Sequence, residues 1–162
     1  MPYVPTTDER TKVLGDVYYE IQQLAATSAM GHPHQNVSNA IVESRLLHVR
    51  SFLDFFERES CSQDDVLAAH YGFPVSSIPV DPPYRERLNK DLAHLTYSRT
   101  MRTPSDKPWP HDRVTKPVLE RCIMFIDHLI ASGTPSHRPE DPEWHGLRSA
   151  LVSALTLISK QP

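Results

Sequence analysis

The stretch Asn39 to Phe56, NAIVESRLLHVRSFLDFF, decides the fold class of this chain of 162 residues. It contains no proline or glycine, and its apolar residues recur at the spacing of an α-helix. Only a narrow face around Glu43 and Asp54 is polar enough to meet water. A helix that is apolar around most of its circumference needs neighbours on several sides. The stretch therefore predicts a central helix, over about residues 36–58, within a helical domain.

The prolines predict where the other helices begin and end. The 15 prolines are clustered, and long proline-free windows separate the clusters. Because proline breaks a helix interior, the windows predict helices and the proline-rich segments predict connections. Further helices are expected over residues 13–25, 83–101, 117–132 and from Asp141 onward, with a short helix at 64–70. The sequence thus predicts an all-α fold, an up-and-down bundle of four to five long helices plus one short helix, as a single domain over residues 1–162.

Composition limits the classes of function. The content of 39% hydrophobic and 23% charged residues is typical of a globular protein. The net charge of −3 shows that the chain as a whole is not a polycation, so nucleic-acid binding would need a local basic patch. The two cysteines lack metal-site spacing, His32 and His34 have no third ligand nearby, and there is no glycine-rich phosphate loop. We therefore expect no metal and no cofactor. The absence of an apolar leader or of a run of about 20 apolar residues predicts a cytoplasmic protein without membrane contact.

The stretch RERLNKDLAHLTYSR, residues 85–99, holds the main candidate residues. On a helix, each residue advances by about 100°, which places the leucines on one stripe and a polar ridge on its flank. The ridge consists of Arg87, Asp91, His94 and Ser98, while Asn89 lies on the opposite flank. The surrounding segment 85–116 has eight Lys or Arg against four Asp or Glu, a local excess of positive charge.

Arg87 and His94 offer the two groups that phosphodiester cleavage needs. The arginine is a fixed cation for a phosphate, and the histidine exchanges protons near neutral pH. Two helical turns separate their α-carbons by about 10.5 Å, a gap that both side chains could bridge toward one phosphate. The alternative is an ordinary solvated helix face, in which an Arg87–Asp91 pair contributes a few tenths of a kcal/mol.

Arg45 and His48 stand within the apolar arc of the central helix. A buried charge is costly unless it is paired, so both side chains are expected to be largely buried and to have partners. We expect at least one to bond a polar residue of the helix that carries Arg87, with Asp91 the favoured carboxylate. The pair would serve either a structural network or the wall of a wet pocket.

The motif Arg87-x6-His94, followed by LTYSR in a helical bundle, resembles the HEPN superfamily of helical nucleotide- and RNA-binding proteins. The resemblance implies a dimeric, metal-independent ribonuclease in which Arg87 contacts the scissile phosphate and His94 transfers protons. A polar residue often follows the arginine in that family, whereas here Leu88 follows it and Asn89 comes next. The segments NAIVESRLLHVRSFLDFF and LAHLTYSR also look like parts of uncharacterised bacterial helical proteins.

Two hypotheses of different classes follow. The first is a homodimeric ribonuclease or RNA-processing protein, with a cognate antitoxin as a conceivable partner and with these supporting residues: Asp91, Ser98, Arg45, His48 and Asn89. The second is a non-catalytic helical module that binds RNA, a nucleotide or a partner protein. Metal-independent RNA cleavage that requires His94 would separate the two.

Overall fold

The computed structural model describes residues 2–92, 97, 100, 103, 108–132 and 141–159. Every regular element within these residues is helical, so the prediction of an all-α fold is confirmed. The long helices are α1 (Thr7–Ala29), α2 (Gln35–Glu57), α5 (Lys116–Ser132) and α6 (Asp141–Ile158). The shorter ones are the 3-10 helix η1 (Ala68–Tyr71), α3 (Pro82–Lys90) and α4 (His111–Val114).

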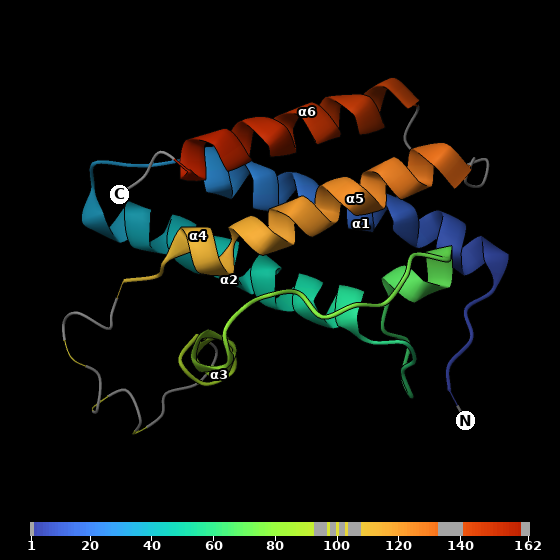
Figure 1. The fold of residues 1–162 in the computed structure, drawn as a ribbon, viewed down its shortest axis with the longest axis horizontal. Coiled ribbons are helices and arrows are strands. Elements are labelled where there is room, and N and C mark those ends of the chain that lie inside the picture. Colours follow the sequence, from blue (N-terminus) through green and yellow to red (C-terminus); the bar gives the residue numbers. More distant parts are fainter. Residues whose placement is uncertain are drawn as a thin grey trace.

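The four long helices form a bundle in which each helix packs against two main neighbours. Helix α6 packs on α1 and α5, α1 also packs on α2, and α2 contacts α5 (Figure 1). One connection departs from a simple up-and-down order, because α2 and α5 run in the same direction. Through the crossover that holds η1, α3 and α4, the chain returns to the end of the bundle where α2 begins. This crossover carries Arg87, Asn89 and Asp91.

Local sequence explains how α1 begins. Thr6 and Glu9 form a capping box: the Thr6 hydroxyl accepts from the Glu9 amide at 3.2 Å, and the Glu9 carboxylate accepts from the Thr6 amide at 2.7 Å. Together the two bonds satisfy amide donors that a helix start leaves without partners. The helix then ends before Gly31 and Pro33, in agreement with the expected connection.

An aromatic cluster fills the centre of the bundle. Phe55 of α2 and Phe125 of α5 meet edge to face, with ring centroids 5.2 Å apart. Phe73, which lies in the extended segment after η1, meets Phe125 at 5.4 Å. Aromatic pairs at these distances add stabilisation beyond the area that they bury. The cluster thus anchors the first residues of the crossover to the bundle.

Two elements differ from their predicted ranges. The helix expected over 83–101 is α3, which ends at Lys90 with Asp91 as its C-cap. Only Arg87 and Leu88 of α3 are buried, so packing supports this helix over a short length. Residues 93–96, 98, 99 and 101 of the expected range lie outside the described residues. The helix expected over 64–70 is η1, a single 3-10 turn that stops at Gly72, whose φ of 71° suits glycine.

Candidate functional site

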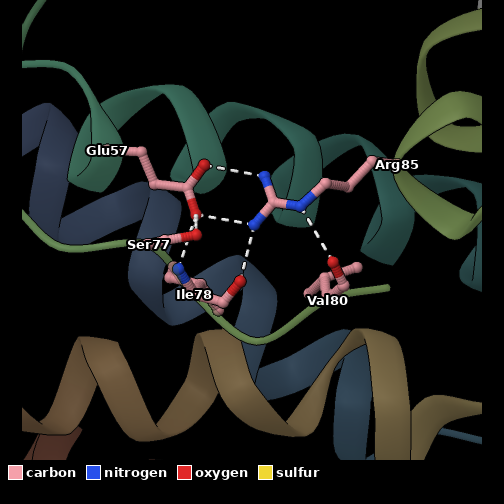
Figure 2. Close-up of polar contacts among 5 residues, drawn as sticks. All are labelled: Glu57, Ser77, Ile78, Val80 and Arg85. Carbon is pink, nitrogen blue, oxygen red and sulfur yellow. Dashed lines mark hydrogen bonds and ion pairs between the residues drawn. The ribbon is translucent and has the colours of Figure 1, made fainter. Parts of the chain in front are cut away.

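An ion pair between Glu57 and Arg85 positions α3 against α2 (Figure 2). The Arg85 guanidinium donates to both carboxylate oxygens of Glu57 at 2.7 Å. It also donates to the carbonyl oxygens of Ile78 at 2.6 Å and Val80 at 2.9 Å, while the Ile78 amide donates to Glu57 at 2.5 Å. Burial opposes the charge of Glu57, yet the bonds from Arg85 and Ile78 hold its pKa below the ordinary value. The contacts join the end of α2, the extended segment and the start of α3.

Arg87, the first residue of the motif, points into the protein. The residue is only 6% exposed, and its guanidinium lies 4.0 Å from the centroid of the Trp109 ring. One terminal nitrogen donates to the Pro108 carbonyl at 3.3 Å, and the Nε atom is 3.9 Å from the carboxylate of Asp91. Arg87 therefore connects α3 to the residues that lead into α4.

Of the other candidate residues near Arg87, the structure describes Asp91 and Asn89. Asp91 is mostly buried, with its side chain 11% exposed, as the expected i,i+4 neighbour of Arg87. Asn89 is exposed and accepts a hydrogen bond from Arg50 of α2 at 3.1 Å. His94 and Ser98 lie outside the described residues, so the geometry of the Arg87–His94 pair stays a prediction.

Arg45 is buried, as predicted, with 3% of its surface exposed. Its Nε atom donates to the Thr27 carbonyl at 3.0 Å, and a terminal nitrogen donates to the same oxygen and, at 3.5 Å, to the Met30 carbonyl. Arg45 therefore does not make the bond to Asp91 or to another residue of the helix carrying Arg87 that was expected of it or of His48. The carbonyls at the end of α1 lack helical donors and attract a cation, and α1 has no basic residue in its last turn.

His48 is partly buried, with 16% of its side chain exposed, and its Nδ1 atom lies 2.7 Å from a carboxylate oxygen of Glu20 on α1. Both polar residues of the apolar arc thus face α1, so the prediction that at least one of them would bond the helix carrying Arg87 is wrong. The apolar arc of α2 does face the interior of the protein, as predicted. At Arg45 and His48, however, the neighbouring helix is α1 rather than α3.

His111, at the start of α4, is a partly buried titratable residue that no sequence pattern indicated. Burial and the nearby charge of Arg45 lower the pKa of His111 to about 4. Its Nδ1 atom lies 3.4 Å from the hydroxyl oxygen of the buried Thr115. The available signal was the placement of His111 after Pro110, where a helix can start, but that pattern does not report the distant Arg45.

Two hollows lie along α1, and no sequence pattern indicated them. One hollow of about 320 Å3 lies among the segment before α1, the first half of α1 and the residues around η1. A second hollow of about 250 Å3 lies between α1 and α2. Val13, Asp16 and Val66 line both hollows, so the two hollows adjoin each other along α1; together they are named here the α1 groove. Its members come from three distant parts of the chain, so no local motif predicted it.

The α1 groove combines an apolar floor with an acidic rim. Phe52, Phe55 and Val17 form part of the floor. The rim has five carboxylates and two cations, which are Glu9, Asp16, Glu20, Asp64, Asp65, Arg10 and Lys12. Its net charge is therefore negative, and a ligand that carries phosphates would be repelled from it.

No protein-family model, curated protein or solved structure matches this chain. Within the described residues, no three His, Cys, Asp or Glu side chains are grouped so that they could hold a metal ion. None of the described helices is both long and apolar enough to cross a membrane.

Proposed function

We propose that this chain is a non-catalytic helical module that binds a partner protein. The observation that carries the proposal is the enclosure of Arg87 by Trp109, Pro108 and Asp91. A phosphate clamp needs a guanidinium that a ligand can reach, and a buried guanidinium that stacks on an aromatic ring and bonds a backbone carbonyl is committed to its own protein. These contacts support a structural role for Arg87 in the crossover.

The α1 groove favours a protein over a nucleic acid as the partner. It is apolar at its floor and negative at its rim, a combination that attracts apolar and basic side chains and repels phosphates. The proposal keeps the cytoplasm as the location and a homodimer as the assembly. The homodimer predicts a mass near twice 18.4 kDa in sedimentation at high protein concentration.

The test of the function is capture of a partner with and without nuclease. The immobilised protein is exposed to a lysate of its source, one half of which is treated with ribonuclease. The proposal expects a protein to be retained equally from both halves. Retention that disappears after ribonuclease treatment would instead support RNA binding.

The competing hypothesis of a ribonuclease has its own test. The purified protein is incubated with mixed RNA in EDTA beside the variants H94A and R87K. Under our proposal, none of the three proteins cleaves RNA. Cleavage by the native chain that H94A abolishes would establish the ribonuclease and reject the module.

A further inference from the structure

We propose that the α1 groove binds a basic amphipathic segment of the partner protein, with two Lys or Arg side chains that pair with Asp16 and Asp64. This inference rests on the proposed function, since it names the surface and the chemistry of the partner. It depends on the shape of the groove, on its apolar floor and on which of its charges already have partners.

The shape suits a short peptide segment. The two hollows of about 320 and 250 Å3 lie in line along α1, and each approaches or reaches the lower end of the range for ligand sites, about 300–1,000 Å3. Because the hollows share Val13 and Val66, apolar side chains from one segment could occupy both. A groove beside a helix that takes apolar side chains at regular spacing is a recurring mode of peptide recognition.

Most charges on the rim are already engaged within the protein. Asp65 pairs with Arg58 at 2.8 Å, and Glu20 contacts His48 at 2.7 Å. On the positive side, Lys12 pairs with Asp8 at 2.7 Å, and Arg10 donates to the His70 carbonyl at 3.1 Å. These groups have partners before any ligand binds.

Asp16 and Asp64 are the exceptions. Both are exposed, and neither has a hydrogen bond or ion pair within the part of the chain that the structure describes. Asp16 lines both hollows and Asp64 lines the larger one, so a segment lying in the groove would pass both carboxylates. A ligand complementary to this surface carries two cations for the two carboxylates and apolar groups for the floor between them. A basic amphipathic peptide has both, whereas a small amine with one charge does not.

The probe is a fluorescent amphipathic peptide of leucine and lysine, roughly four helical turns long, titrated with the full chain and followed by fluorescence anisotropy. A second peptide has serine at every leucine position. The protein variants are D16K/D64K and the control E43K/E120K, which changes net charge equally at exposed positions outside the groove.

We expect D16K/D64K to weaken binding of the leucine–lysine peptide by about tenfold or more, and E43K/E120K to weaken it by less than about twofold. The serine peptide should bind at least about tenfold more weakly than the leucine peptide, because it has no apolar side chains to bury against the apolar floor of the groove. Equal weakening by the two double variants would reveal general charge attraction and overturn the proposal, as would equal affinity for the two peptides or no binding at all.

The two proposals fail in different ways. If the peptide does not bind but the captured protein persists after ribonuclease treatment, the module stands and its surface lies elsewhere. If the peptide binds at Asp16 and Asp64 but capture depends on RNA, the groove stands and the proposed function is rejected.

Discussion

Arg45 of α2 donates hydrogen bonds from two of its nitrogens to the carbonyl oxygen of Thr27, in the last turn of α1. A side chain of one helix thus caps the end of the preceding helix, at the point where the chain turns between them. The contact satisfies a carbonyl that the helix itself leaves without a donor, and it places a cation at the negative end of the helix dipole.

Replacing Arg45 with leucine should lower the free energy of unfolding by about 2 kcal/mol. The change removes the donors to Thr27 and Met30, and a buried acceptor left without a partner costs about 1–3 kcal/mol. Burial of the charged guanidinium is itself unfavourable, as the lowered pKa of Arg45 indicates. Leucine removes this unfavourable contribution, which offsets part of the destabilisation. Urea denaturation measures the effect, and R113L at an exposed position of α4 is the control, with a change below about 0.5 kcal/mol. A leucine variant as stable as the native chain would contradict the capping role.

The stability of the protein should depend on His111 between about pH 6.5 and pH 4. The pKa of His111 is lowered to about 4 by burial and by Arg45, so the folded protein keeps this side chain neutral while the unfolded chain protonates it below its ordinary pKa of 6.5. The unfolded state then binds more protons, and the free energy of unfolding falls as the pH drops through this window and levels off below it. Because His111 is only partly buried, we expect a fall of about 1–2 kcal/mol.

Denaturation midpoints at several pH values, compared with those of H111Q, measure this dependence. The variant should have a flatter profile between pH 6.5 and 4. Proton NMR titration of the R45L protein adds a direct readout, in which the pKa of His111 should rise toward 6.5 because a nearby positive charge is gone. Identical pH profiles for H111Q and the native chain would exclude His111 as the titrating group.

The helices were predictable because their signals are local, whereas the contacts of the candidate residues were not. Proline placement and apolar spacing indicated the start of α6 at Asp141, and the apolar arc of α2 indicated that Arg45 is buried. The partner of Arg45 is a backbone carbonyl at the end of another helix, which any residue type can offer. The end of α3 at Lys90 was missed because the apolar spacing continues past it, and Leu92 beyond the helix end still packs against the core.

Replacing Glu57 with glutamine should destabilise the crossover by about 2 kcal/mol. The change removes the carboxylate that accepts hydrogen bonds from Arg85 through both of its oxygens. Arg85 is then left partly buried without its counterion. Thermal unfolding measures the loss, and D54N, on the exposed face of the same helix, is the control. Since the pKa of Glu57 is lowered, its contribution is present above its ordinary pKa of 4.5 and is lost as the pH falls below that value. Equal stability of E57Q and D54N would contradict a role for the ion pair in holding α3.

Replacing Arg87 with alanine should lower the free energy of unfolding by about 3 kcal/mol and expose Trp109 to water. The variant loses a stacked cation, a hydrogen bond to the Pro108 carbonyl and the counterion of Asp91, all in a mostly buried position. Tryptophan fluorescence should shift to longer wavelength, and the shift reports Trp109 because Trp144 is buried in α6. The control is K90A, which removes an exposed i,i+4 pair with Glu86 on the same helix and should cost less than about 0.5 kcal/mol.

The R87K variant separates a structural Arg87 from one that handles phosphate. Lysine keeps the positive charge but loses the planar group that stacks on Trp109, so R87K should have a stability between those of R87A and the native chain. If Arg87 serves the crossover alone, R87K should bind the leucine–lysine peptide as the native chain does at a temperature where both are folded, because Arg87 does not line the α1 groove. A fully stable R87K that loses RNA binding or cleavage would instead assign Arg87 to a phosphate.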